Sequence, residues 1–399
     1  MSKLFLAPPA AARVRDYDPW VLAKDVIRTE GRAPFGATVT VCGADGEPLA
    51  KASISPESKI RARIWHWSPN KPLDHAWFKA AVAHAYQRRV TLGLVGGARA
   101  YRLIAAEGDS MPGVVIDNYA GTLVVQLTSA GAEKWRDAIV QAAVEVTGAN
   151  HVYERSDAKV REVEGLARRS GVIMGDARLG SREQPLTIQE GRVRYFVDIQ
   201  TGHKTGFYLD QAQNRALIAD LAKGKTVLNC FSYTGGFGVA AACAGAFRVV
   251  NIDSSAPALS LGQLAMQDHP AASQIEWRRA DVKKALAGYA DDQKSFDVVI
   301  LDPPKLAPSK ASARKALGVY GELNRRALSL LPIGGMLASF SCSSAITMTM
   351  FRTMLTRAAG QVGVQIAILT ALSASADHPT NPALADDGYL KGLLVTRLA

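Results

Sequence analysis

Cysteine is scarce in this chain, and its distribution disfavours two kinds of site. The 399 residues include Cys42, Cys230, Cys243 and Cys342, with no Cys-x-x-Cys pair and no histidine at metal-ligand spacing. Structural zinc sites and disulfide frameworks depend on such spacings. We therefore expect no metal and no disulfide, as is usual for a protein of the reducing cytoplasm.

Long apolar runs are also absent. No segment offers the roughly 18 consecutive uncharged apolar residues that a membrane span requires. Met1–Ala12 contains one lysine and a short apolar stretch interrupted by Pro8 and Pro9, which is unlike a secretory signal. Internal repeats and long low-complexity tracts are missing as well. We expect a cytoplasmic globular chain with no membrane partner.

Acidic residues are fewer than basic ones. The chain has 36 Asp and Glu against 47 Lys and Arg, which gives a net charge of +11. Such an excess favours polyanions, chiefly nucleic acid or an anionic membrane surface, although a chance excess would look the same. The length predicts two or three domains, and the 48% of hydrophobic residues is an ordinary globular value.

The first 186 residues show two successive patterns. Residues 1–72 predict a small β-rich domain, because β-type runs at 37–42 and 49–54 flank a Gly-rich turn and a third run follows. Residues 73–186 predict an α+β domain, with helices expected at 74–92 and 132–147 and strands between them.

Residues 187–399 predict a doubly wound α/β domain. A β-hairpin with Gly191 at its turn is expected to connect at 187–207, and strand–helix alternation follows. The expected strands are 226–230, 248–253, 276–280, 296–301, 336–341, 365–369 and 391–396.

The first of these strands leads into a Gly-rich turn and then a helix, at Ser232-Tyr-Thr-Gly-Gly-Phe-Gly. Glycines let a ligand approach the backbone, and the helix N-terminus lies behind it. The next strand ends in Asp253, whose carboxylate could accept both ribose hydroxyls of a nucleoside, and the third is followed by Asp281, which could accept an adenine amino group. These tips suit NAD or S-adenosylmethionine, but the Gly-x-Gly-x-x-Gly spacing of a pyrophosphate site is missing, which favours S-adenosylmethionine.

The fourth strand ends abruptly in Asp302-Pro303-Pro304, and two prolines cannot continue a ladder, so the carboxylate is left at the strand tip. Asp/Asn-Pro-Pro at this place is typical of enzymes that methylate nucleobases. Cys342 follows the fifth strand and should lie at the same sheet edge. A thiolate that adds to C6 of cytosine makes C5 nucleophilic, and a carboxyl group near N3 can supply or share a proton. We expect Cys342 and Asp302 to be catalytic, whereas the other cysteines fit the core.

These motifs resemble one family. Asn229-Cys-Phe-Ser-Tyr-Thr-Gly-Gly-Phe, Asp302-Pro-Pro-Lys and Ser341-Cys-Ser, preceded by Gly202–Gln211 and Asn214-Arg215, are similar to the bacterial 23S rRNA cytosine-C5 methyltransferases of the RlmI type. The resemblance covers essentially the whole chain. It implies a PUA domain at 1–72, a middle α+β domain at 73–186 and a class I (Rossmann-like) methyltransferase domain at 187–399.

The resemblance implies methylation of one cytosine in 23S rRNA or a large-subunit precursor, with S-adenosylmethionine as cofactor; a homodimer is compatible with it. The expected cofactor contacts are Gln211, Asn229, Phe231, Tyr233, Thr234, Gly235, Asp253, Ser254, Asp281, Val282, Asp302 and Pro303. Expected RNA contacts are Arg61 and Arg63 in the β-rich domain and Lys305, Lys310, Arg314 and Lys315 after the Asp-Pro-Pro turn, although a solvated helix face would also carry such charges.

Two alternatives stay open. A sister family methylates guanine or other RNA bases and lacks the cysteine, so the need for Cys342 separates the two readings. An RNA-binding ribosome assembly factor without catalysis would not need the intact set of Asp253, Asp281, Asp302 and Cys342.

Overall fold

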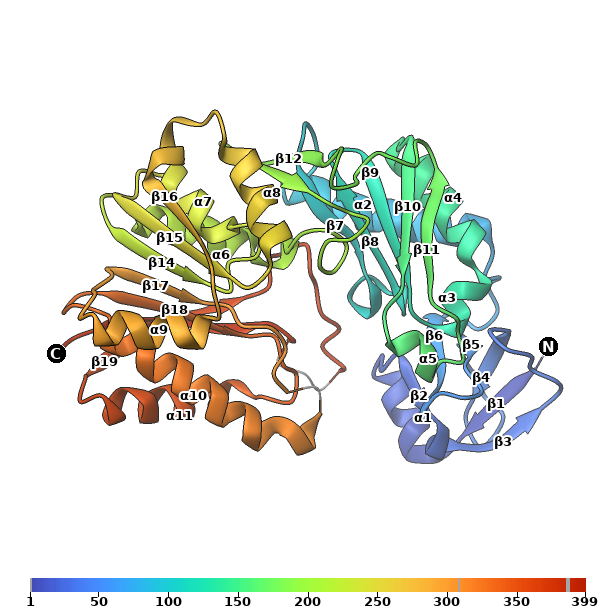
Figure 1. Ribbon diagram of the computed structural model, residues 1–399. Helices are drawn as coiled ribbons and strands as arrows, with labels where there is room; N and C mark the ends of the chain where they lie inside the picture. Colours follow the sequence, from blue (N-terminus) through green and yellow to red (C-terminus); the bar gives the residue numbers. More distant parts are fainter. Residues whose placement is uncertain (1, 308, 385–387) are drawn as a thin grey trace. The chain divides into compact units, whose positions relative to one another are not determined.

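The computed structural model describes residues 2–307, 309–384 and 388–399, and the chain divides into two compact units (Figure 1). Unit 1 contains residues 1–188, 197–207 and 376–385, and unit 2 contains the remainder. Both units are therefore assembled from separate stretches of chain. Among the described residues, no helix is long and apolar enough to cross a membrane.

Unit 1 begins with a six-stranded sheet in the order β2-β6-β5-β4-β1-β3. Its elements are β1 (Lys3–Leu6), α1 (Pro8–Arg15), β2 (Trp20–Leu22), β3 (Val26–Glu30), β4 (Thr38–Cys42), β5 (Pro48–Ile54) and β6 (Ile60–His66). The hairpin expected around the Gly-rich turn is β4–β5, and it is antiparallel as predicted. The sequence pattern missed β1 and α1, because Pro8 and Pro9 looked like interruptions. Proline is well tolerated at the first helical positions, where its missing N–H would have no helical partner.

The rest of unit 1 is built on a five-stranded sheet in the order β11-β10-β9-β8-β7. The elements are α2 (His75–Thr91), β7 (Ala100–Ala105), β8 (Val114–Tyr119), β9 (Thr122–Leu127), α3 (Ala130–Lys134), α4 (Arg136–Thr147), β10 (His151–Ser156), α5 (Val160–Val163) and β11 (Arg169–Met174). The expected helix at 74–92 is α2, which Asp74 caps by accepting a hydrogen bond from the Trp77 amide. The helix expected at 132–147 is divided into α3 and α4.

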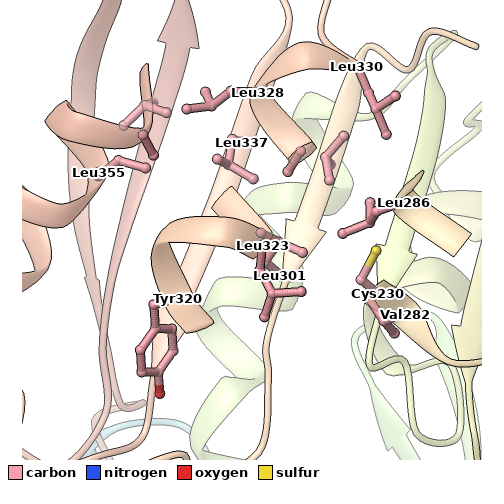
Figure 2. Close-up of a cluster of buried hydrophobic side chains, with 14 of the residues drawn as sticks. Cys230, Val282, Leu286, Leu301, Tyr320, Leu323, Leu328, Leu330, Leu337 and Leu355 are labelled. Atoms are coloured by element: carbon pink, nitrogen blue, oxygen red, sulfur yellow. The ribbon is translucent and has the colours of Figure 1, made fainter. Parts of the chain in front are cut away.

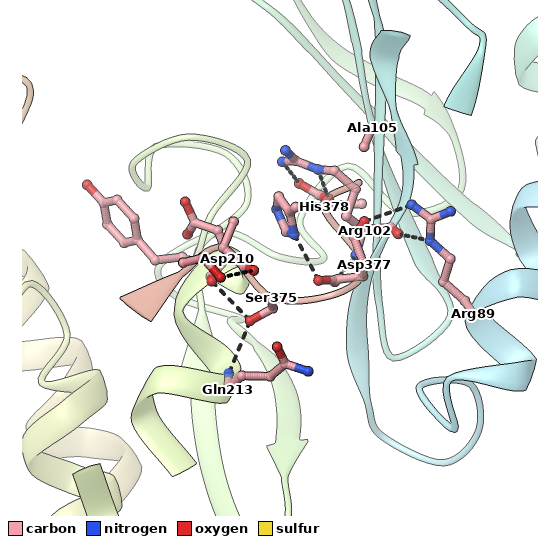
Figure 3. Close-up of polar contacts among 12 residues, drawn as sticks. Arg89, Arg102, Ala105, Asp210, Gln213, Ser375, Asp377 and His378 are labelled. Atoms are coloured by element: carbon pink, nitrogen blue, oxygen red, sulfur yellow. Dashed lines mark hydrogen bonds and ion pairs between the residues drawn. The ribbon is translucent and has the colours of Figure 1, made fainter. Parts of the chain in front are cut away.

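Hydrogen bonds tie this part of unit 1 to Asp377, which is far away in the sequence. Arg89 forms a buried ion pair with Asp109 at 2.7 Å. Arg89 also donates to the Asp377 carbonyl, and the Arg102 amide donates to the Asp377 carboxylate at 2.8 Å (Figure 3). Burial alone would raise the pKa of Asp109, but the hydrogen bonds and charge of Arg89 outweigh it and lower that pKa. Asp109 is therefore held as a carboxylate inside unit 1.

Unit 2 contains a seven-stranded sheet in the order β16-β15-β14-β17-β18-β20-β19. The strands are β14 (Thr226–Cys230), β15 (Arg248–Asp253), β16 (Ile275–Arg279), β17 (Val298–Leu301), β18 (Met336–Ser341), β19 (Ile366–Ser373) and β20 (Lys391–Arg397). All five strands from β14 to β18 are parallel, and β20 runs antiparallel between β18 and β19. The doubly wound fold is confirmed, and the bounds of β14, β15 and β18 are those expected from the sequence. The preceding hairpin is β12 (Leu186–Glu190) and β13 (Val193–Val197).

Helices cover both faces of this sheet, with α6–α8 on one side and α9–α11 on the other (Figure 1). They are α6 (Ala212–Leu221), α7 (Gly236–Cys243), α8 (Ala256–Met266), α9 (Val282–Asp291), α10 (Ala313–Ser329) and α11 (Met348–Gln361). Apolar residues of α9, α10 and α11 pack against β14, β17 and β18, as Figure 2 shows for Leu286, Leu323 and Leu355. This core fixes the strand ends at which the candidate site lies.

Candidate active site

The turn between β14 and α7 brings backbone close to any ligand bound there. Phe231, Tyr233 and Gly235 all have positive φ, at 58°, 52° and 80°. Left-handed backbone costs a residue with a side chain about 1–3 kcal/mol and is concentrated at functional sites. A Cβ on Gly235 would lie 2.5 Å from a ring carbon of Trp277, so no larger residue fits. The turn is therefore a strained loop in which the packing of Trp277 requires glycine at position 235.

Asp253, the last residue of β15, holds this turn in place. Its Oδ2 accepts a hydrogen bond from the Tyr233 amide and its Oδ1 accepts one from the Ser255 amide, both at 2.8 Å. Each carboxylate oxygen can accept more than one hydrogen bond, and the residue is only half-buried. Asp253 can therefore support the loop and accept hydroxyl groups of a ligand together. Its neighbour Ser254 is exposed.

Three buried polar atoms of this region lack a hydrogen-bond partner among the described residues: Ser232 Oγ, Thr234 Oγ1 and Asn251 Nδ2. Leaving a buried polar group unpaired costs about 1–3 kcal/mol, so such atoms mark a place where a polar ligand or water completes the structure. The predicted S-adenosylmethionine fits this turn, because it is rich in donors and acceptors. Asn229, in contrast, is 1% exposed and donates to Asn251 Oδ1, so it supports the region from within the sheet.

Asp281 and Val282 begin α9. Asp281 is exposed, and its Oδ1 caps the helix by accepting the Lys284 amide at 2.9 Å. Val282 is 4% exposed and belongs to the hydrophobic core. A contact of Asp281 with adenine stays a prediction, in which one carboxylate would serve both the helix and the ligand.

Asp302 and Cys342 lie at the ends of neighbouring strands. Leu301, the last residue of β17, pairs with Ser339 of β18, so the two segments leave the sheet side by side. The Cys342 thiol lies 3.9 Å from the Pro303 carbonyl oxygen. Asp302 Oδ2 accepts a hydrogen bond from the Gln211 amide at 3.0 Å, and Asp302 and Cys342 are both half-buried. The predicted catalytic pair is thus found at one edge of the sheet.

Hydrogen bonds with Tyr320 and Lys391 fix the turn that carries Cys342. Ser341 donates to the Tyr320 hydroxyl at 3.0 Å, and the Ser343 hydroxyl lies 3.4 Å from it. Lys391, which is 2% exposed, donates to the Ser343 carbonyl at 3.2 Å. Because residues on either side of Cys342 are tied to Tyr320, the thiol is fixed on the opposite face of the extended chain.

Tyr208 is a further residue of this edge that sequence reasoning did not single out. Burial raises the pKa of its phenol, and the neighbouring carboxylate of Asp302 raises it further. Its ring packs edge-on against Tyr233, with the ring centroids 5.4 Å apart. Each of two residues missed by the sequence analysis had one feature that could have pointed to it. Tyr208 lies inside the Gly202–Gln211 motif, and Lys391 is a charged residue at the start of an apolar strand.

The basic residues that follow the Asp302-Pro303-Pro304 turn divide into two groups. Lys305, Lys310, Arg314 and Lys315 are exposed. Arg325 and Arg326 of the same helix pair with Glu322, at 2.8 and 2.7 Å, and are half-buried. An RNA contact therefore stays a prediction for the exposed group.

In the β-rich part of unit 1, Arg61 is half-buried and donates to the Pro56 carbonyl. Arg63 is 8% exposed and forms two 2.9 Å hydrogen bonds with Glu164. A buried guanidinium with a bidentate partner has little to offer a phosphate, so this arrangement argues against the expected RNA contact of Arg63. Trp65, two residues further along the same strand, is 1% exposed and belongs to a hydrophobic core.

The other cysteines are removed from this chemistry. Cys42 and Cys230 are buried, and burial raises the pKa of both thiols. Cys243 is half-buried, 3.8 Å from a ring nitrogen of His269. No group of three His, Cys, Asp or Glu side chains that could hold a metal ion is found in residues 2–307, 309–384 and 388–399.

Comparison with known proteins gives two family matches. Residues 176–379 match the model of S-adenosylmethionine-dependent methyltransferases, and residues 4–67 match that of a PUA-like domain. A curated relative from Aeromonas salmonicida, named ribosomal RNA large subunit methyltransferase I, is 42% identical over 378 residues, and one of the same name from Aeromonas hydrophila is 43% identical over 379. Each alignment covers 94% of both chains.

Solved structures share the fold. A SAM-dependent methyltransferase from Streptococcus mutans aligns with a TM-score of 0.83 at 23% identity, over 99% of this chain and all of the other. A methyltransferase complexed with SAH aligns with a TM-score of 0.84 at the same identity and coverage.

Proposed function

The chain belongs to the S-adenosylmethionine-dependent methyltransferases of the ribosomal RNA large subunit methyltransferase I family, and from this premise we propose that it forms 5-methylcytosine in 23S ribosomal RNA. The observation that carries the proposal is the neighbourhood of Cys342 and the Asp302-Pro303 turn, with the thiol 3.9 Å from the Pro303 carbonyl. Methylation of a ring carbon needs a covalent activator beside a proton-handling group. Methylation of an amino group does not require a thiol.

The proposed chemistry uses Cys342 as nucleophile. Its thiolate forms a bond to C6 of a cytosine taken out of its stack, and the electron pair of the C5–C6 double bond makes C5 enamine-like. A proton at N3, supplied or shared by Asp302, relieves the charge on the ring. When bound, S-adenosylmethionine supplies an electrophilic methyl group. Loss of the C5 proton to a base then re-forms the double bond, and the S–C6 bond breaks with its electron pair returning to sulfur.

We assign the cofactor to the turn after β14, with Asp253 on the ribose and Asp281 near the adenine. Gln211, Ser254, Val282 and the Asp302-Pro303 turn complete the assignment. The unpartnered polar atoms around the turn and the tight packing at Gly235 support it. RNA is assigned to the PUA-like residues 4–67 and to the exposed cations after Asp302, in keeping with the net charge of +11.

Nucleoside analysis tests the product. Ribosomal RNA from a strain lacking this gene should lack 5-methylcytosine at one position of the large subunit, and mass spectrometry should show its return with the wild-type gene. Cys342→Ala should fail to restore it while still binding S-adenosylmethionine, because the change removes chemistry rather than cofactor contacts. Cys243→Ala is the matched control and should restore the modification.

Trapping tests the covalent step. RNA with 5-fluorocytosine at the target should remain bound to the wild-type enzyme, because fluorine cannot leave C5 as a proton does. The peptide recovered from the adduct should contain Cys342. Methylation by Cys342→Ala, or an adduct on Cys230 or Cys243, would contradict the mechanism and favour methylation of guanine or of an amino group.

A further inference from the structure

Two buried amides connect Asp302 to a backbone carbonyl far away in the sequence. Asn214 Nδ2 donates to the Ser373 carbonyl at 2.9 Å and to Gln211 Oε1 at 2.6 Å. Gln211 Nε2 donates in turn to Asp302 Oδ2 at 3.0 Å. Gln211 is 2% exposed and Asn214 is 5% exposed, so water does not easily replace these partners. We call these hydrogen bonds the amide relay.

The direction of the amide relay is fixed at its far end. The Ser373 carbonyl can only accept, so Asn214 must present its NH2 group there. The same NH2 group also faces the Gln211 side chain, which must therefore accept with its carbonyl oxygen. Gln211 is therefore left with its NH2 group directed at Asp302. Reversal of the Gln211 amide would place two donors together at one end and two acceptors at the other.

We propose that Gln211 and Asn214 are positioning residues that hold the Asp302 carboxylate ionised and in one orientation during methyl transfer. The inference rests on the proposed function, because it gives Asp302 a part in the reaction. A hydrogen bond donated to the charged form of an acid favours that form, whereas partial burial disfavours it. In that state Asp302 shares the proton at N3 rather than supplying it, because an ionised carboxylate can only accept a hydrogen bond from a ring that carries this proton after the thiolate has added to C6.

Other titratable groups lie at this edge beside the amide relay. Tyr208 precedes the short helix η3 (Leu209–Gln211), Tyr320 comes from α10 and Cys342 follows β18. Burial raises the pKa of both phenols, and the carboxylate of Asp302 adds to each shift. Both phenols are therefore neutral at neutral pH. A Cys342 thiolate would repel the negative charge on Asp302 and so disfavour its ionised form. Lys305, on the Asp302 turn itself, is exposed.

Three substitutions change the relay in different ways. Gln211→Glu replaces the donor that faces Asp302 by a second carboxyl group. Asn214→Asp introduces an acceptor that only the Gln211 NH2 group can satisfy, which turns the Gln211 carbonyl towards Asp302. Gln211→Met removes the donor and adds no acceptor. Gln213→Glu is the matched control: it adds the same charge two residues away on an exposed side chain.

The decisive measurement is the dependence of kcat on pH. We expect the acid limb to move upward by about one pH unit in Gln211→Glu, which is a tenfold change in proton affinity. Asn214→Asp should shift it in the same direction, Gln211→Met should shift it less, and Gln213→Glu should keep the wild-type profile. Melting temperature is measured on every variant, so loss of fold is seen separately, and S-adenosylmethionine affinity shows whether the assigned cofactor contact of Gln211 is lost as well.

A reading independent of turnover is the 13C titration of the Asp302 carboxyl carbon, assigned by its absence in Asp302→Asn. Its midpoint should move upward in the same order. Lower kcat with unchanged pH profiles and titration midpoints would overturn the inference and leave the relay a purely structural feature. The proposed function fails by a different result, namely that the wild-type enzyme produces no 5-methylcytosine.

Discussion

Replacement of Asp253 tests the cofactor assignment most directly. Its carboxylate accepts the Tyr233 and Ser255 amides, so it shapes the strained turn as well as offering oxygens to a ribose. Each hydrogen bond to a charged group contributes about 1.5–3 kcal/mol. Two ribose bonds, discounted because the residue is half-buried, give a loss of about 2–4 kcal/mol in binding free energy. Asp253→Ala should therefore weaken S-adenosylmethionine binding by roughly 30- to 1000-fold.

Two companion variants separate the two tasks of Asp253. Asp253→Asn keeps the shape and one good acceptor, so it should hold the turn better than alanine but still bind the cofactor more weakly than the wild type. Asp281→Ala removes an exposed helix cap, which should cost about 1 kcal/mol of stability and a smaller share of affinity. Titration calorimetry supplies the dissociation constants. An Asp253→Ala protein with wild-type affinity would refute the assignment.

Further predictions concern RNA binding, packing and acid stability. Arg314→Ala should lower the slope of log affinity against log salt by about one if that side chain contacts a phosphate, and an unchanged slope would mean that it is only solvated. Gly238→Ala would place a Cβ 2.1 Å from Asn251 and should destabilise the protein by about 1–3 kcal/mol in urea, whereas Gly288→Ala, which meets nothing within 4 Å, should be neutral or stabilising. Burial raises the pKa of Glu164, but Arg63 outweighs burial and the net shift is downward. The Arg63–Glu164 pair should give its full stabilisation above pH 4.5 and lose it as the pH falls through the lower folded-state pKa of Glu164. The difference in free energy of unfolding in urea between wild type and Glu164→Gln should therefore disappear over that pH range.

Strand ends were the part of the fold and site that the sequence predicted well. β14, β15 and β18 are apolar runs closed by turn residues, and parallel strands align their carboxyl ends by necessity. Asp302 and Cys342 could be placed together on that ground alone. The strand β10 could not be predicted in this way, because it buries Glu154, whose carboxylate pairs with Arg136 at 2.8 Å. A hydrophobic pattern does not reveal charged residues that are buried as pairs.

Contacts across long sequence distances explain the remaining misses. The bond from Asn214 to Ser373 joins positions 159 residues apart, and that from Lys391 to Ser343 joins positions 48 apart. Local pattern gives no reason to bring these residues together, and only the packed sheet does. Arg63 shows the same limit, because the sequence suggested an RNA contact, whereas its partner Glu164 lies 101 residues further on.

Some contacts of unit 1 can form only late in the synthesis of the chain. The hydrogen bond from the Arg102 amide to Asp377 spans 275 residues, and Arg89 depends on the same segment. A ribosome that adds roughly 5–20 residues per second needs roughly 15 to 55 seconds to supply Asp377 after Arg102 has been made. For that interval the Arg89 guanidinium and the Arg102 backbone amide lack their bonds to Asp377, so unit 1 cannot finish folding until a residue 275 positions after Arg102 has been made.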